Sequence, residues 1–217
     1  MANSRGVVKS FRELYELLDA VIDPGTWWPA ETHFEIGVGA ILTQNTAWSN
    51  VEQAIDALRA HRLLNPTGIA AVDREGLKEL IRPAGFMNAK ANYLKNYATW
   101  YLANYTTAAE LDTDQLRQHL MAVRGIGPET ADVFMLYVYN RPVFIWDTYA
   151  RRLLTAAGYT VPNAYESARR ALSPTMSEAQ FSTAEHQWFH GLIVQAGKYA
   201  TAAGGRETYW RQLHLNH

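Results

Sequence analysis

Apolar residues recur at intervals of three and four along most of this chain, and this spacing constrains its fold more than any other feature. The segment FRELYELLDAVI, residues 11–22, is the clearest example, and residues 48–58 and 90–102 repeat the pattern. Such spacing places the apolar side chains on one face of an α-helix. The alternation of apolar and polar residues that is typical of β-strands is scarce. The sequence therefore predicts an all-α fold.

Segments that contain proline or glycine separate the predicted helices. They read NPTG, RPAGF, GIGP, NRP and SPT, and segments of this kind end helices or form turns. Further helices are expected over residues 73–82, 112–122, 128–139, 147–157, 163–172 and 178–200. We therefore expect helices joined by short loops, with neither a tandem repeat nor a low-complexity linker.

The composition excludes several classes of protein. The 217 residues, of which 48% are hydrophobic, suffice for one large or two small globular domains. The absence of cysteine excludes disulfides, thiolate zinc sites, cysteine nucleophiles and cysteine-ligated iron–sulfur clusters. The longest apolar run, VFMLYVY, is too short to span a membrane, and the segment MANSRGVVKS lacks the apolar core of a signal peptide. We therefore expect a cytoplasmic protein.

The segment MAVRGIGPETADVF, residues 121–134, joins a glycine pair directly to the start of a helix. Gly125 and Gly127 permit positive φ angles and the close approach of another molecule to the backbone. Pro128 suits the first turn of a helix, and Glu129 suits its positive end. The amides at such a turn can bind an anion such as a DNA phosphate. An ordinary connection between two helices would use the same residues, so both interpretations stay open here.

Asp147 follows an apolar connection and precedes the next predicted helix, where capping of that helix alone would explain an aspartate. The hairpin VRGIGPETA, the helix after it, the apolar connection and the motif WDTY nevertheless occur together. In this combination they resemble the helix-hairpin-helix DNA glycosylase superfamily, specifically its endonuclease III-like branch. The separation between Glu129 and Asp147 matches the spacing in that family without a gap. The resemblance implies a protein that binds double-stranded DNA containing damaged bases.

The resemblance covers most of the chain, from about residue 27 to residue 200. The segment EIGVGAILTQNTAWSNVEQAI is similar to the family's loop that enters the duplex, which implies that role for Gln44. The segment GFMNAKANYL is similar to the stretch that supplies a second wedge, which implies Phe86 or Met87. The segment HGLIVQAGKYA is similar to the C-terminal helix that precedes the family's iron–sulfur loop.

The chain departs from the family pattern at two places. Members that also cleave the backbone carry a lysine where this chain has Glu129, and that lysine attacks the sugar to form a Schiff base. A carboxylate cannot do so, and we therefore expect base removal without cleavage of the abasic site. The cysteines that bind the cluster are also absent. We expect ordinary packing, through Tyr209, Trp210 and Leu213, to hold the C-terminal segment instead.

The tryptophans indicate what kind of base is removed. Trp27 and Trp28 lie in a loop bounded by proline and glycine, so we expect exposed rings that stack on a flipped base. Trp48 lies on the apolar face of its helix and fits a pocket wall or the core equally well. Aromatic faces attract cations, and alkylated purines such as 3-methyladenine carry positive charge. The GIGPETAD hairpin with the WWP loop resembles the 3-methyladenine DNA glycosylase subgroup.

Membership of that subgroup implies that Asp147, Glu129 and Lys198 belong to the site. We expect Asp147 to stabilise oxocarbenium character at the sugar and to orient the attacking water. Glu129 would shape the pocket and hydrogen-bond the base or order the water. Lys198 is either a buried amine with a shifted pKa, a partner of a carboxylate, or a lysine that extends from the helix edge into solvent.

Several alternatives stay open at this point. A related enzyme could remove a neutral base such as uracil, mismatched thymine or an oxidised base, and a non-catalytic DNA-binding protein could use the hairpin alone. The segment EHQWFH places His186 and His190 four residues apart, but the pattern lacks the glutamate of a zinc protease, so we interpret both as structural. We expect no metal cofactor, apart from a monovalent cation that the hairpin carbonyls could hold.

The net charge of −1 gives no general sign of a polyanionic partner, so nucleic-acid binding needs a local basic patch. The segments that the resemblance places near DNA contain Lys90, Arg124, Lys198 and Arg206, each of which could equally be a solvated charge.

The resemblance also implies an architecture. We expect a monomer with two helical lobes and a DNA cleft between them. One lobe, a six-helix barrel that contains the hairpin, would span residues 28–140. The other would be discontinuous and join residues 1–27 to residues 141–217.

Overall fold

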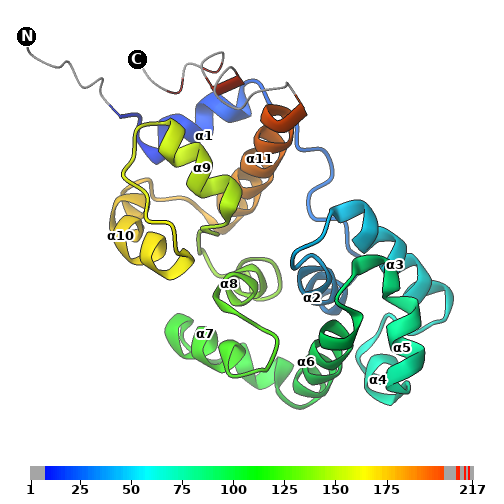
Figure 1. Cartoon of the computed structure of the whole chain (residues 1–217). Coiled ribbons are helices and arrows are strands. Elements are labelled where there is room, and N and C mark those ends of the chain that lie inside the picture. Colours follow the sequence, from blue (N-terminus) through cyan, green and yellow to red (C-terminus); the bar gives the residue numbers. More distant parts are fainter. Residues whose placement is uncertain (1–7, 203–208, 211–212, 214, 216–217) are drawn as a thin grey trace, which may run out of the picture. The chain divides into compact units, whose positions relative to one another are not determined.

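The computed structural model describes residues 8–202, 209, 210, 213 and 215, and within this part every regular element is a helix (Figure 1). The all-α prediction is therefore confirmed. The chain divides into two compact units. We call residues 29–141 the hairpin unit and residues 1–28 with 142–217 the terminal unit. No described helix combines the length and the apolar character needed to cross a membrane.

The hairpin unit contains α2 (His33–Leu42), α3 (Trp48–Ala60), α4 (Pro66–Ala71), α5 (Arg74–Leu80), the short η1 (Arg82–Ala84), α6 (Met87–Ala108), α7 (Thr113–Met121) and α8 (Pro128–Tyr137). The long α6 packs against α2, α4 and α5, and α2 packs in turn against α8 (Figure 1). Almost every residue of α2 and α8 is buried. These two helices thus form the centre of the unit, and the hairpin lies at the start of one of them.

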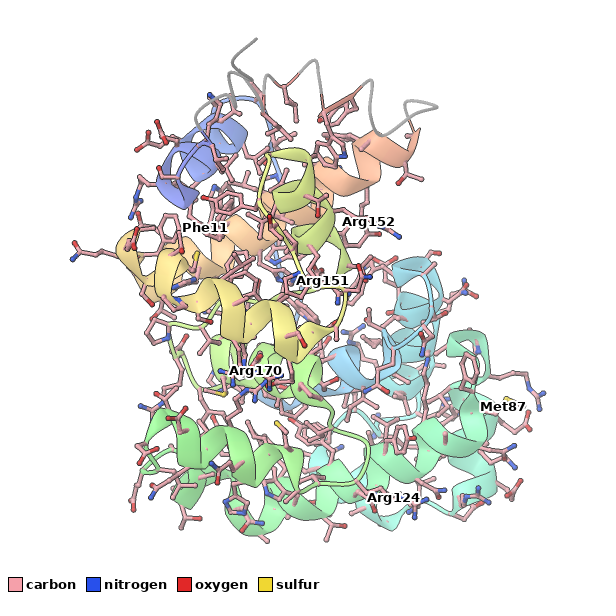
Figure 2. The ribbon with its side chains drawn as sticks, turned by 60° about the vertical axis from the view of Figure 1, so that its left-hand side comes forward. Phe11, Met87, Arg124, Arg151, Arg152 and Arg170 are labelled. Atoms are coloured by element: carbon pink, nitrogen blue, oxygen red, sulfur yellow. The ribbon has the colours of Figure 1, made fainter. Side chains whose placement is uncertain are left out.

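The terminal unit contains α1 (Phe11–Asp19), α9 (Thr148–Ala156), α10 (Tyr165–Glu178) and α11 (Thr183–Ala202). The helix α11 packs against both α1 and α9. Phe11 lies on α1 (Figure 2). Its ring is buried in the core of this unit beside Phe144 and Trp146. Trp210 belongs to the same core, and Tyr209 and Leu213 pack against it, as expected from the sequence.

Two proline-containing segments form part of a helix. NPTG still lies between α3 and α5, as expected, but begins a short helix, whereas SPT does not separate two helices. In NPTG, the side chain of Asn65 accepts a hydrogen bond from the Gly68 amide at 2.7 Å and Pro66 occupies the first turn, so the segment begins α4. In SPT, Pro174 lies inside α10, which continues to Glu178. Leu172 and Met176 are buried on either side of this proline, so packing holds the helix together there.

The helix α2 was not among the helices expected from the sequence. Its residues, HFEIGVGAIL, are buried on nearly all sides and therefore show no amphipathic spacing. A short continuous apolar run does not distinguish a buried helix from a buried strand.

Candidate functional site

The hairpin of the predicted motif joins α7 to α8, and the two helices are held together by a buried ion pair. Arg117 on α7 donates to both carboxylate oxygens of Asp132 on α8, at 2.6 and 3.2 Å. Ile126, in the turn itself, is also buried. The two helices that the turn connects are thus fixed to each other, and part of the turn itself is buried.

The two glycines of the turn have different roles. Gly125 has a φ of +108°, and a Cβ atom there would lie 2.3 Å from Cγ of Tyr93. Gly127 has a φ of −86°, so it does not use the positive φ that glycine permits; as the N-cap of α8 its backbone is extended. Nothing lies within 4 Å of the position that a Cβ of Gly127 would take. Gly125 therefore makes the turn possible, whereas Gly127 leaves open space in front of it.

The N-terminus of α8 offers polar groups to this open space. The amides of a first helical turn have no carbonyl partner within the helix, and the helix dipole makes this end positive. Arg124, beside the turn, has an exposed side chain, and its carbonyl accepts a hydrogen bond from Asn96 at 3.0 Å (Figure 2). Glu129, in the first turn, is exposed as well. The geometry suits an anion at the backbone and places a carboxylate one residue beyond Pro128.

Gln44 lies against the hairpin in this structure. Its side-chain amide donates to the carbonyl of Gly125 at 3.0 Å and to Oγ1 of Thr130 at 3.1 Å. The side chain is half-buried and connects the end of α2 to the turn. Its expected entry into the duplex stays a prediction.

The two wedge candidates differ in exposure. Phe86 is 67% exposed and has a φ of 49°, at the residue before α6. Met87, the first residue of α6, is only half-exposed (Figure 2). Of the two, Phe86 offers more apolar surface to another molecule.

Lys90 is not a surface cation, so the expectation that it belongs to a basic patch is wrong. Its ammonium is buried and donates to the carbonyls of Leu42 and Ala84, at 2.8 Å each. Burial lowers its pKa. These carbonyls end α2 and η1, where a cation compensates unsatisfied acceptors. Arg206 lies outside the described residues.

In the terminal unit, Asp147 is the N-cap of α9, as the sequence indicated. Its Oδ1 accepts a hydrogen bond from the Ala150 amide at 2.7 Å. Its Oδ2 lies 3.7 Å from Nε2 of His190 on α11. The aspartate is only 8% exposed. One oxygen therefore caps the helix, and the other faces His190.

Trp27 and Trp28 surround the same histidine. The ring of Trp27 meets His190 edge to face, with centroids 5.4 Å apart, and that of Trp28 stacks on it at 6.5 Å. Trp27 also packs on Gly191, where a Cβ atom would lie 2.9 Å from Cγ of the indole. Both indoles are half-buried, so they are less exposed than expected from the sequence. Asp147 and the two tryptophans thus form one cluster around His190.

Lys198 is exposed on α11, which contradicts the alternative of a buried amine. Its Nζ lies 5.9 Å from the centroid of the Trp27 ring, a separation typical of a cation–π contact. One residue earlier, Gly197 lets Tyr149 of α9 pack on α11, since a Cβ atom there would lie 2.2 Å from the tyrosine ring. Lys198 therefore reaches along the edge of its helix towards Trp27.

Trp48 begins α3 in the hairpin unit and is half-buried. Its Nε1 donates to Oε1 of Glu52 at 2.9 Å. It is not among the buried residues of that helix, which are Val51, Ala54, Ile55 and Leu58. The interpretation of Trp48 as an ordinary core residue is therefore disfavoured, and a pocket role stays a prediction.

The two histidines of EHQWFH have different surroundings. His186 is buried against Phe181, its Nδ1 has no hydrogen-bond partner, and burial lowers its pKa to about 4. His190 belongs to the Asp147 cluster, which sequence reasoning missed; the available signal was its place two helical turns before Lys198. Among the described residues, no group of three potential ligands could hold a metal ion.

Comparisons with known proteins agree on one family. The model of the HhH-GPD superfamily base excision DNA repair protein matches residues 38–176. A curated protein of Methanocaldococcus jannaschii, named as a candidate DNA repair glycosylase, is 39% identical over 194 residues, covering 85% of this chain and 87% of that protein.

Solved structures agree with this match. The H. pylori 3-methyladenine DNA glycosylase (MagIII), bound to 1,N6-ethenoadenine, is similar with a TM-score of 0.72 and 25% identity, over 88% of this chain and 98% of that chain. Endonuclease III in a trapped covalent intermediate with DNA has the same fold, with a TM-score of 0.69 and 19% identity, over 86% and 83% of the two chains.

Proposed function

We propose that this chain, which belongs to the HhH-GPD superfamily of base excision DNA repair proteins, is a monofunctional glycosylase for alkylated purines such as 3-methyladenine. The family itself makes the chain a DNA glycosylase of base excision repair. The choice of substrate and the lack of lyase activity are the proposal. The observation that carries the choice of substrate is the cluster in which the carboxylate of Asp147 and the indoles of Trp27 and Trp28 all contact His190.

Such a cluster favours a cationic base over a neutral one. The electron-rich faces of indoles attract cations, and a carboxylate nearby adds an attraction of the same sign. A purine alkylated on a ring nitrogen carries a positive charge, which also weakens its bond to the sugar. The similarity to a solved structure named as a 3-methyladenine DNA glycosylase supports this substrate class.

The reaction begins with the damaged nucleotide rotated out of the duplex. The bond between C1′ and the base nitrogen breaks, and the base leaves as a neutral molecule with both bonding electrons. The carboxylate of Asp147 stabilises the positive charge that develops on the sugar. A water oxygen then bonds to C1′ and gives its proton to the carboxylate, which passes it to solvent. The products are the free alkylated base and an abasic site.

Glu129 accounts for the absence of a second reaction. Forming a Schiff base with the sugar requires a primary amine, which a carboxylate lacks. We assign Glu129 to hydrogen bonding with the base or to ordering the water, so the backbone stays intact after base removal.

We assign the grip on the DNA backbone to the N-terminus of α8. The amides beyond Gly127 face open space, and Arg124 supplies an exposed positive charge next to them. Phe86 is the better wedge candidate because two-thirds of its surface is already exposed. Gln44 is placed beside the turn, where it can exchange its bond to Gly125 for one to DNA.

The test is a panel of duplexes that each contain one damaged base, incubated with the purified protein. We expect release of 3-methyladenine at least about tenfold faster than release of the neutral bases uracil, mismatched thymine or 8-oxoguanine. Treatment with borohydride should trap no covalent adduct. Faster release of a neutral base would overturn the substrate, an adduct would overturn the assignment as monofunctional, and binding without turnover would indicate a non-catalytic protein.

A further inference from the structure

His190 connects the carboxylate of Asp147 to both indoles of the terminal unit. Its Nε2 faces Oδ2 of the aspartate at 3.7 Å, while its ring lies edge to face with that of Trp27 and is stacked with that of Trp28. All these residues lie in one compact unit, and His190 is only 6% exposed. A buried imidazole in this position restricts how the acid and the indoles can move relative to one another.

The orientation of the aspartate depends on what holds each of its oxygens. The bond from the Ala150 amide holds Oδ1, as in any N-cap. The remaining oxygen, Oδ2, is free of that constraint and faces His190. At 3.7 Å the two atoms are neighbours without a direct hydrogen bond between them.

We propose that His190 is a positioning residue that fixes Oδ2 of Asp147 and aligns it with the indole pair. This inference rests on the proposed function, in which the carboxylate of Asp147 stabilises the positive charge that develops on the sugar. The role requires two properties of the side chain: a nitrogen at the Nε2 position, and a flat ring that fills the space against Trp27 and Trp28. Substitutions can separate these two properties.

The experiment compares His190→Phe with His190→Gln in single-turnover excision of 3-methyladenine. Phenylalanine keeps the ring and loses the nitrogen, whereas glutamine places an amide nitrogen close to the Nε2 position. We expect the excision rate of His190→Phe to fall about 10-fold to 100-fold, since a misplaced catalytic group costs about this much. The Kd for lesion DNA should change less than about threefold, because the indoles still stack the base. His190→Gln should recover the rate to within about fivefold of the wild-type value.

A matched control is available on the same helix. His186 is also a buried histidine of α11, but it packs against Phe181 and belongs to neither the carboxylate nor the indole cluster. We expect His186→Phe to keep the wild-type excision rate. Equal rates for His190→Phe and the wild type would overturn the proposal, as would a loss of rate in His186→Phe equal to that in His190→Phe.

If His190→Phe does not fold, the pair His190→Gln and His190→Asn replaces it. Asparagine is too short to bring its amide to the Nε2 position, so only glutamine should support excision. Equal excision by the two variants would overturn the positioning role.

If the wild type excises no alkylated base, the proposed function is contradicted. The positioning role of His190 can still be tested in that case. A double-mutant cycle on unfolding, with His190→Phe and Asp147→Asn, then measures whether the two residues act together. We expect a coupling of about threefold or more in the unfolding constant, and additivity would overturn the inference.

Discussion

The ring of Tyr93 lies directly on the α-carbon of Gly125, so closely that a Cβ atom there would meet Cγ of the tyrosine at 2.3 Å. The contact joins α6 to the hairpin and leaves glycine as the residue that fits, because the φ of +108° disfavours any other. The turn of the hairpin is therefore built on a packing contact inside the hairpin unit.

The two glycines of the turn should respond differently to alanine. Gly125→Ala should lower the free energy of unfolding by about 2 kcal/mol or more, from the strained φ and the overlap with Tyr93. Gly127→Ala should change it by less than about 1 kcal/mol, because its φ suits any residue. Its new methyl group would nevertheless occupy the space in front of the amides and weaken DNA binding. Urea unfolding and DNA titration measure the two effects, and equal destabilisation by both substitutions would contradict the assignment.

Substitutions of Arg124 and Lys90 should distinguish a residue that contacts DNA phosphates from one that stabilises the fold. Arg124→Gln should weaken binding to all duplexes about equally and reduce the slope of log Kd against log salt by about one. Lys90→Gln should leave that slope unchanged and destabilise the fold, since the shorter amide of glutamine cannot take the place of the ammonium between the carbonyls of Leu42 and Ala84. Binding measured over a series of salt concentrations distinguishes the two variants. A reduced slope in Lys90→Gln would show that its ammonium reaches DNA after all.

The lowered pKa of His186 predicts how the free energy of unfolding depends on pH. Its folded pKa of about 4 lies below the ordinary value of 6.5, so the unfolded chain binds more protons between these values. The contribution of the neutral imidazole is therefore complete above pH 6.5 and is lost as the pH falls towards 4. This contribution to the free energy of unfolding amounts to at most about 3.5 kcal/mol, at about 1.4 kcal/mol per pKa unit. His186→Phe should show a weaker loss of unfolding free energy between pH 6.5 and 4, and an identical loss would contradict the burial argument.

Substitution of Phe86 should affect base excision more than it affects the stability of the fold. With 67% of the residue exposed, Phe86→Ala should change the free energy of unfolding by less than about 1 kcal/mol. It should slow base excision by about tenfold, because less apolar surface remains to occupy the gap in the duplex. Met87→Ala is the matched neighbour and should slow excision less. The reverse order of the two rates would transfer the wedge role to Met87.

The sequence indicated the helical fold and the hairpin because both depend on local patterns. Amphipathic spacing marked most helices, and the order of GIGPETA and WDTY indicated the family that the comparisons confirm. The position of Asp147 as an N-cap was predicted for the same reason, since a capping residue is defined by the helix that follows it.

What the sequence missed depends on contacts between segments far apart in the chain. His190 reads as a structural residue until α11 and α9 come together and place it beside Asp147. Lys90 and Lys198 both occur in partly apolar runs, yet one is buried on two carbonyls and the other is exposed. The packing of their helices determines which of the two lysines is buried. The helix α2 was not predicted because it is buried on nearly all sides and shows no amphipathic spacing.

The central claim is that the carboxylate of Asp147 promotes loss of a cationic base, and Asp147→Asn tests it most directly. Asparagine caps a helix about as well as aspartate, so α9 and the free energy of unfolding should change little. We predict that single-turnover release of 3-methyladenine from duplex DNA falls at least about 100-fold while the Kd for that duplex stays within about threefold. Full excision activity in the folded variant would contradict the account.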